Sequence, residues 1–291
     1  MKKTIGVFNK IAAKIVGQKN LENLLIYSAK SIDTDLLRHA QIQIGASGDS
    51  GLDNERLFIK KILPCFLNGD DTPVIFDVGA NVGNYSLALR AQFPKATIYA
   101  FEPVKKTFEI LANNVDGKNI KTHNLGFSDK AGTGKLFNIV NSEDTEIASL
   151  YEDVFSGIFQ SSAEVTSTEF VMETLDSFCS ANHILSVDFL KIDVEGHELF
   201  VLRGAEKLIE NNGLKIIQFE FNSHNVFSRV FLRDFYLILE NFEFYRILES
   251  GLAKLGPYTA LNEIFVQQNL LAVRRDLCHL IKPSFLSALS A

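Results

Sequence analysis

From residue 74 onward, short apolar runs typical of strands alternate with segments whose apolar residues recur at helical spacing. Strands are predicted over 74–78, 96–102, 119–127, 187–194, 215–221, 243–250 and 263–275. Helices are predicted over 84–93, 104–115, 175–182, 197–212 and 229–242, and two short extra strands over 134–140 and 169–175. This alternation is typical of βαβ units, which build a parallel sheet covered by helices on both faces. The last two strands lack a full-length helix between them. The sequence therefore predicts an α/β fold with a seven-stranded, mostly parallel, doubly wound sheet whose last strand is reversed.

Residues 1–73 show no strand pattern, and we expect a helical N-terminal extension or cap in front of a domain over 74–291. Apolar residues between Ile5 and Ile15 share one face of a predicted helix, with lysines on the other. We expect this helix to pack on the domain, and a contact with a membrane surface is the alternative. Lysines interrupt its apolar run and no small-residue cleavage site follows, so we expect a cytoplasmic protein rather than a secreted one.

Composition argues against several classes of function. The formal net charge is −6 and the isoelectric point is near 5.6, whereas nucleic-acid binding normally needs a clustered basic surface. Cys65, Cys179 and Cys278 are far apart and form no CxxC pair, so neither a disulfide framework nor a zinc ribbon is predicted. No apolar run reaches the roughly 20 residues that span a membrane. The pattern does not indicate an oligomeric state.

A glycine-containing turn, DVGANVGN, joins the first predicted strand to its helix. A dinucleotide-binding fingerprint would have glycine where this chain has Asn81 and Asn84. The Asn81 side chain would obstruct a pyrophosphate, whereas Gly79 and Gly83 still let a ligand without phosphate approach the backbone. Asp77 ends the strand and can accept a hydrogen bond from an ammonium group.

Acidic residues also follow the next two predicted strands. Glu102 ends the second strand, where a carboxylate can accept both hydroxyls of a ribose. Ser128 and Asp129 follow the third strand, where an acid can accept from the amino group of adenine. Acceptors for an ammonium, a ribose and an adenine in this order, without a phosphate cradle, predict that the site holds S-adenosylmethionine.

These motifs resemble those of the FkbM family of methyltransferases. The resemblance rests on FDVGANVGNYS (76–86), YAFEPVKKTFE (99–109), LGFSD (125–129), ETLDSF (173–178), FLKIDVEGHELFVLRGA (189–205) and IIQFEF (216–221). The KIDVEGHE segment is its most specific part. The resemblance implies a class I S-adenosylmethionine-dependent methyltransferase fold. It also implies methylation of a hydroxyl on a small molecule or glycan, such as a sugar, a polysaccharide or a secondary metabolite.

KIDVEGHE supplies the candidate catalytic residues at the end of the fourth predicted strand: Lys191, Asp193, Glu195 and His197. A hydroxyl acceptor must lose a proton as its oxygen takes the methyl group. His197, with an ordinary pKa of about 6.5, and Asp193 are the two candidate bases. Glu195 could orient the histidine or contact the methionine part of the cofactor, and Asp193 could also bind the cofactor. Lys191 could simply pair with a neighbouring acid.

Acceptor contacts are expected from Tyr85 in the first helix and from Glu220, Asn222 and His224 at the end of the fifth strand. Glu220 lies in an otherwise apolar strand, where an unpaired carboxylate is costly, so it needs a partner. Our main expectation is no metal. The alternative is a divalent cation held by the oxygens of Asp193, Glu220 and Asn222.

Two other functions stay open. A nicotinamide-dependent oxidoreductase or sugar epimerase would share the fold, but the missing glycines count against it. A non-catalytic binding module on a degenerate methyltransferase fold would not need the acidic and glycine positions that this chain keeps.

Overall fold

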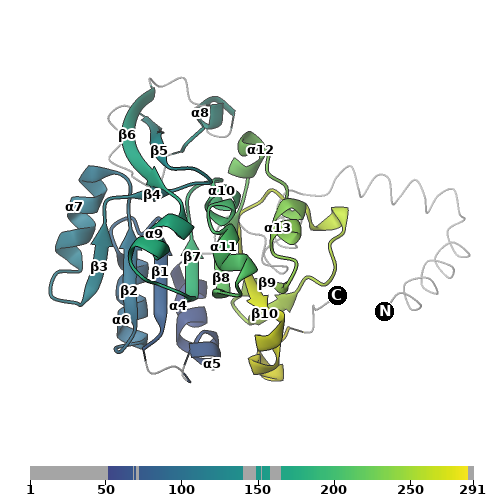
Figure 1. Ribbon diagram of the computed structural model, residues 1–291. Helices are drawn as coiled ribbons and strands as arrows, with labels where there is room; N and C mark the ends of the chain where they lie inside the picture. Colours follow the sequence, from purple (N-terminus) through teal and green to yellow (C-terminus); the bar gives the residue numbers. More distant parts are fainter. Residues whose placement is uncertain are drawn as a thin grey trace, which may run out of the picture. The chain divides into compact units, whose positions relative to one another are not determined.

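The computed structural model describes residues 52–67, 69, 72–139, 149–151, 153–157 and 165–287 (Figure 1). By compactness the chain divides into Met1–Gln43 and Ile44–Ala291, and all described residues belong to the second unit. The expected amphipathic helix near the N-terminus lies outside the described residues. The expected domain boundary at residue 73 stays a prediction.

An eight-stranded, mostly parallel sheet forms the centre of this unit, in the order β10-β9-β11-β8-β7-β1-β2-β3. Its strands are β1 (Val74–Val78), β2 (Thr97–Phe101), β3 (Ile120–His123), β7 (Val187–Ile192), β8 (Leu214–Phe221), β9 (Phe242–Leu248), β10 (Gly251–Lys254) and β11 (Gln268–Arg274). The last strand, β11, lies between β8 and β9 and runs antiparallel to both. The expected mostly parallel sheet with a reversed last strand is confirmed. The expected count of seven was one too low, because β10 pairs with β9 as an edge strand.

Helices cover both faces of the main sheet (Figure 1). They are α6 (Asn84–Gln92), α7 (Lys105–Asn114), α9 (Leu175–Ala181), α10 (Glu198–Arg203), α11 (Glu206–Glu210), α12 (His224–Ser228) and α13 (Leu232–Ile238), with short turns η3 (Ala260–Asn262), η4 (Arg275–Leu280) and η5 (Pro283–Phe285). Successive residues of a strand point to opposite faces. Phe76 accordingly packs with α9, α10 and α13, whereas Ile75 packs with α6. Among the described residues, every helix is too short or too polar to cross a bilayer.

The described part of the N-terminal region is helical, with α4 (Leu52–Leu57), the π-helical turn η1 (Phe58–Ile62) and α5 (Pro64–Leu67). Phe58, Ile59 and Ile62 are buried in the same hydrophobic cluster as Ile75 of β1 and Phe189 of β7. These helices therefore form part of the core against one face of the main sheet.

A second, three-stranded sheet has the order β4-β6-β5, with β4 (Gly126–Phe127), β5 (Gly132–Ile139) and β6 (Val165–Glu173). It lies above the main sheet in Figure 1, beside α8 (Asp153–Gly157). The strand expected over 119–127 is thus two strands in different sheets. The bend between them is held by the side-chain amide of Asn124, which donates to the backbone oxygens of Glu102 and Pro103.

The single helix expected over 197–212 is broken into α10 and α11. The break lies at Gly204, whose backbone oxygen accepts from the backbone N–H of Asp176 in α9. The Asp176 carboxylate in turn accepts from the backbone N–H groups of Lys207 and Leu208 in α11. These long-range bonds replace the continuous helical ladder, and they bring the start of α9 close to α11.

Candidate functional site

One cavity of about 510 Å³ opens at the carboxyl ends of β1, β2, β7 and β8. Ligands bind at this edge in open α/β sheets. Its lining includes residues that the sequence analysis selected: Gly79, Asn81, Glu102, Asp193, Glu195, Glu220, Asn222 and His224. The small sheet lines another part of it through Leu136 and Asn138 of β5 and Thr168 and Phe170 of β6. The cavity therefore lies between the two sheets.

The turn after β1 brings the backbone close to the end of β7. Gly79 has a φ of +81°, and a Cβ atom added there would lie 1.8 Å from the backbone oxygen of Asp193. Asn81 is also left-handed, with a φ of 47°, and its backbone N–H donates to Oε2 of Glu102 over 3.1 Å. Gly83, with a φ of +93°, caps α6. The turn thus presents backbone rather than side chains at this end of the cavity.

Glu102 lies at the end of β2 with its carboxylate in the cavity wall. Oε1 accepts from the backbone N–H of Val104 over 2.9 Å, and Oε2 accepts from Asn81. Burial raises the pKa of Glu102 to about 7, although the two backbone bonds act in the opposite direction. The orientation of this carboxylate is therefore fixed by backbone donors on both sides.

Asp77 and Tyr85 lie beneath the cavity and are not among its described lining residues. Oδ2 of Asp77 accepts from the Ser86 hydroxyl over 2.6 Å, and its Oδ1 lies 4.0 Å from the Lys191 ammonium. The Tyr85 hydroxyl donates to Oε1 of Gln218 over 2.6 Å. The expected contacts of Asp77 with a ligand ammonium and of Tyr85 with an acceptor therefore find no support in this geometry. Asp77 instead faces an ammonium of the protein itself.

Lys191 is buried beneath the same wall. Its Nζ donates to Oδ2 of Asp193 over 2.9 Å and lies 4.7 Å from the centre of the Tyr85 ring. Burial alone would lower the pKa of Lys191, but the carboxylates of Asp193, Asp77 and Glu55 raise it well above its ordinary value. Lys191 therefore stays charged and holds Asp193 in place. This contact matches the alternative that Lys191 pairs with a neighbouring acid.

His197 lies beside the cavity and not in its described lining. Its Nδ1 is 3.0 Å from the Tyr151 hydroxyl, its Nε2 is 2.9 Å from the Ser128 hydroxyl, and its ring stacks on Phe200 with centres 4.5 Å apart. The Ser128 hydroxyl donates to Oδ1 of Asp129. Burial lowers the pKa of His197 to about 4. The imidazole is thus neutral, and both of its nitrogens contact protein groups.

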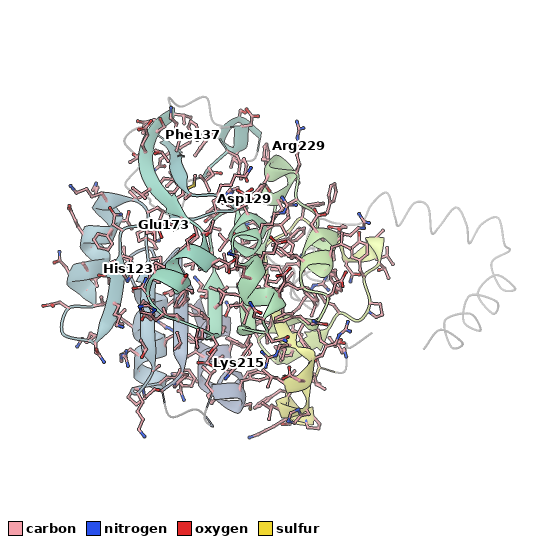
Figure 2. The ribbon with its side chains drawn as sticks, in the orientation of Figure 1. His123, Asp129, Phe137, Glu173, Lys215 and Arg229 are labelled. Carbon is pink, nitrogen blue, oxygen red and sulfur yellow. The ribbon has the colours of Figure 1, made fainter. Side chains whose placement is uncertain are left out.

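Figure 2 shows Asp129 below the small sheet that carries Phe137, on the segment between β4 and β5. Neither Ser128 nor Asp129 is in the described lining, where Leu125, Gly126 and Phe127 are found instead. The expected role of Ser128 and Asp129 as adenine acceptors stays a prediction. The bend into β4 turns these two side chains toward His197.

His224, the first residue of α12, is the histidine that lines the cavity within the described part of the chain. Its Nδ1 lies 2.8 Å from Oε2 of Glu195. Burial lowers the pKa of His224, and the carboxylates of Glu198 and Asp193 oppose this effect. Gly196 permits the contact, because a Cβ atom added there would lie 2.8 Å from Cβ of His224. Glu195 and His224 thus form a pair across the turn after β7.

Glu220 lies at the end of β8 and is only 7% exposed. Oε2 accepts from the Asn222 side-chain amide over 2.9 Å, and Oε1 accepts from the side-chain amide of Gln267. Burial raises the pKa of Glu220 well above its ordinary value, and the nearby carboxylates of Asp193 and Glu195 add to this effect. The sequence analysis missed Gln267. It precedes the reversed strand β11, which starts at the edge where the parallel strands end.

The alternative of a divalent cation can be compared with these contacts. One carboxylate oxygen each of Asp193, Glu195 and Glu220 lies within 4.8 Å of the others. Asn222, which the sequence analysis included in place of Glu195, uses its side-chain oxygen to accept from the backbone N–H of His224. Lys191 contacts Asp193, His224 contacts Glu195, and two amides donate to Glu220. The protein's own groups thus satisfy these acids, and the expectation of no metal stays a prediction.

Comparisons with known proteins place this site in a family. The family model described as "Methyltransferase FkbM domain" matches residues 77–247. Methyltransferase sdnD of Sordaria araneosa is 29% identical, over 48% of this chain and 63% of its own. Hexuronic acid methyltransferase AglP of Haloferax volcanii is 26% identical, over 51% of this chain and 56% of its own. The solved structure of methyltransferase FkbM from Methylobacillus flagellatus KT is 14% identical, with a TM-score of 0.40, over 69% of this chain and 44% of that chain.

The chain thus spans less than two thirds of the length of these relatives. The family match covers more than half of this chain, from Asp77 in β1 to Ile247 in β9. It includes the ends of β1, β2, β7 and β8 that line the cavity. The chain belongs to the FkbM family of methyltransferases.

Proposed function

We propose that this protein transfers the methyl group of S-adenosylmethionine to a hydroxyl group of a sugar, a polysaccharide or a secondary metabolite. One observation carries the proposal: a single cavity contains Glu102 at one strand end and Glu220, Asn222 and His224 at another. The first group suits a nucleoside, and the second offers several polar atoms to a hydroxylated acceptor. Family membership supports methyl transfer as the reaction.

The cofactor end has the groups that a nucleoside without phosphate requires. The Glu102 carboxylate, fixed by backbone donors, can accept both hydroxyls of the ribose. The close approach of Gly79 to Asp193 leaves backbone and one carboxylate near the methionine part. Asn81 occupies the position where a dinucleotide fold needs glycine, which disfavours the oxidoreductase alternative.

The acceptor end lies beside the small sheet. Asn138 and Thr168 offer polar side chains there, opposite the Glu220 and His224 side. Two relatives are named for hydroxylated acceptors: hexuronic acid methyltransferase AglP of Haloferax volcanii, and 31-O-demethyl-FK506 methyltransferase FkbM of Streptomyces tacrolimicus. We extend to this chain only the shared feature, a hydroxyl on a small or glycan acceptor.

The experiment uses the full chain and S-adenosylmethionine with a labelled methyl group. The acceptor panel contains the methyl glycosides of glucose, rhamnose, glucosamine and glucuronic acid, each with Mg²⁺ and with a chelator. We expect an alkali-stable methyl ether on at least one of them. Glu102→Ala should lower the transfer rate about 10- to 100-fold at cofactor concentrations below the wild-type KM. A folded wild type that binds no S-adenosylhomocysteine, after removal of co-purified ligand, would overturn the proposal in favour of a binding module.

A further inference from the structure

We propose that His224, oriented by Glu195, is the general base that takes the proton from the acceptor hydroxyl. This inference rests on the proposed function, because it assigns a role within that reaction. It moves the base from His197 and Asp193, the two candidates within the KIDVEGHE motif, to the other side of the turn after β7.

The geometry of the pair sets the tautomer of the imidazole. Nδ1 of His224 lies 2.8 Å from Oε2 of Glu195, an ion-pair contact whose geometry is not that of a hydrogen bond. A carboxylate at Nδ1 favours the proton on that nitrogen, so Nε2 carries the lone pair of the neutral ring. His224 lines the cavity together with Glu220 and Asn222, in the part that we assign to the acceptor. Glu195 acts through the histidine and is a positioning residue.

The backbone around both residues holds the pair in place. Glu195 and Gly196 have φ values of 54° and +92°, which turn the chain back toward α12. Oε1 of Glu198 closes this turn by accepting from the backbone N–H groups of Val194 and Gly196. The backbone N–H of His224 donates to the Asn222 side chain over 2.8 Å. Such fixed geometry is what proton transfer in a bound complex requires.

Titratable groups from three elements surround His224. They are Asp193 after β7, Glu195 and Glu198 in the turn and at the start of α10, and Glu220 in β8. The Asp193 and Glu195 carboxylates favour the imidazolium that forms when the proton arrives. Before proton transfer, burial lowers the pKa of His224. The ring is therefore neutral near pH 7 and can accept a proton.

The other candidate bases fit the role less well. Both ring nitrogens of His197 contact hydroxyl groups outside the cavity lining. Lys191 is held in its charged form by the acids around it. Glu220 is held in its protonated form by burial and by the nearby acids. Asp193 uses Oδ2 to accept from Lys191.

The proposed step is balanced in atoms and electrons. The O–H bond of the acceptor breaks and its proton goes to Nε2 of His224. The oxygen lone pair forms the new bond to the methyl carbon, and the pair of the broken carbon–sulfur bond returns to sulfur. The products are the methyl ether and S-adenosylhomocysteine, and the imidazolium beside Glu195 then loses its proton to solvent.

The first test needs no acceptor. Nitrogen NMR of histidine-labelled protein saturated with S-adenosylhomocysteine reports the tautomer and the pKa of each ring, and loss of a signal in His224→Gln assigns His224. We expect a neutral ring protonated at Nδ1 near pH 7. Glu195→Gln should move the population toward the other tautomer and lower the pKa, because a negative charge is lost. A wild-type ring protonated at Nε2, or charged at pH 8, would overturn the proposal.

The second test is kinetic and uses the acceptor found in the panel. His224→Gln should lower kcat at least 100-fold while KM for S-adenosylmethionine changes less than threefold. Glu195→Gln should lower kcat about tenfold and shift the acidic limb of the pH–rate profile to lower pH. His183→Gln is the matched control, because this exposed histidine precedes β7 at the opposite edge of the sheet. Retention of more than a third of kcat in His224→Gln would overturn the proposal.

Failure of this inference can be told from failure of the proposed function. If the wild type binds S-adenosylhomocysteine but methylates nothing in the panel, the hydroxyl-acceptor assignment fails. The NMR tautomer still decides whether His224 and Glu195 form the oriented pair.

Discussion

At the scale of single residues, the site contains three buried acids that form no ion pair with a lysine or arginine among the described residues. Glu102, Glu198 and Glu220 are each less than 9% exposed, and burial raises the pKa of all three. Backbone N–H groups hold Glu102 and Glu198, and side-chain amides hold Glu220. The pKa values of Glu102 and Glu198 are raised to about 7 and about 8, so binding and stability should depend on pH in the neutral range.

The first prediction concerns Glu102 and the pH dependence of cofactor binding. The ribose hydroxyls donate, so they bind the ionised carboxylate more strongly than the protonated one. With a pKa of about 7, Glu102 is mostly protonated at pH 6 and mostly ionised at pH 8. Calorimetry should therefore show S-adenosylhomocysteine binding about tenfold more tightly at pH 8 than at pH 6. The dependence should be much weaker in Glu102→Gln, and an equal dependence in both proteins would contradict the assignment.

The second prediction concerns Glu198 and stability. Glu198→Ala leaves the N–H groups of Val194 and Gly196 without their acceptor in a buried turn, so the free energy of unfolding should fall by about 2–3 kcal/mol. Urea unfolding measures this change. Glu198→Gln keeps an acceptor oxygen and is the matched control.

The pH dependence of the same residue has a definite sign. Burial raises the pKa of Glu198 from 4.5 to about 8, so the folded state binds more protons than the unfolded state between these values. The contribution of Glu198 to stability is therefore greatest below pH 4.5 and decreases as the pH rises toward 8. The unfolding free energy of Glu198→Gln should lack this pH-dependent contribution. A difference in unfolding free energy between wild type and Glu198→Gln that stays constant with pH would contradict the account.

At the scale of elements, the site depends on turns that follow parallel strands. The turn after β1 contacts the end of β7, and the turn after β7 contacts α12. Strand ends are readable from sequence, which is why Glu102, Asp193, Glu220 and His224 were all expected at one edge and do line one cavity. The direction of a side chain leaving a turn is not readable in this way. The sequence suggested His197 as a base and His224 as an acceptor contact, and of the two only His224 is in the described lining of the cavity.

Long-range hydrogen bonds explain where the expected elements differed from the observed ones. The helix over 197–212 has unbroken apolar spacing, and only the bond from Asp176 to Gly204 interrupts it. The strand over 119–127 divides because Asn124 bonds back to the end of β2. β10 is four residues long, too short for a periodic signal. Gln267 was missed because it precedes a reversed strand, whereas the other site residues follow parallel strands.

The third prediction tests the contact between the β1 turn and β7. Gly79→Ala adds a Cβ atom 1.8 Å from the Asp193 oxygen at a positive φ, so stability should fall by about 3 kcal/mol and cofactor binding should weaken strongly. Gly132→Ala in β5 is the matched control, since nothing lies within 4 Å of the added atom. Thermal unfolding measures the stability of both variants, and calorimetry measures their cofactor binding. Equal stability and equal affinity in the two variants would contradict the contact.

At the scale of the whole molecule, the cavity is acidic. Glu102, Asp193, Glu195 and Glu220 line it, and the described lining contains no Lys or Arg. The ammonium nearest these acids, that of Lys191, is buried beneath the wall against Asp193 and Asp77. A neutral or cationic acceptor therefore meets a favourable field, whereas a carboxylate-bearing acceptor meets like charges in a poorly solvated site.

The fourth prediction follows from this field. A methyl glucoside should be methylated with a kcat/KM at least tenfold higher than the corresponding methyl glucuronide, which differs mainly by its carboxylate. Glu195→Gln should narrow the difference, because it removes a negative charge from the cavity lining. Preference for the glucuronide in the wild type would show that another part of the chain supplies a cation.

The most direct test of the account is calorimetric titration of S-adenosylhomocysteine at pH 8 into wild type, Glu102→Ala and His224→Gln. The account assigns Glu102 to the cofactor end and His224 to the acceptor end of one cavity. It predicts that Glu102→Ala weakens binding 10- to 100-fold, as expected for a hydrogen bond to a charged group, while His224→Gln changes it less than threefold. Wild-type affinity in Glu102→Ala, or a folded wild type without any binding, would contradict the central claim.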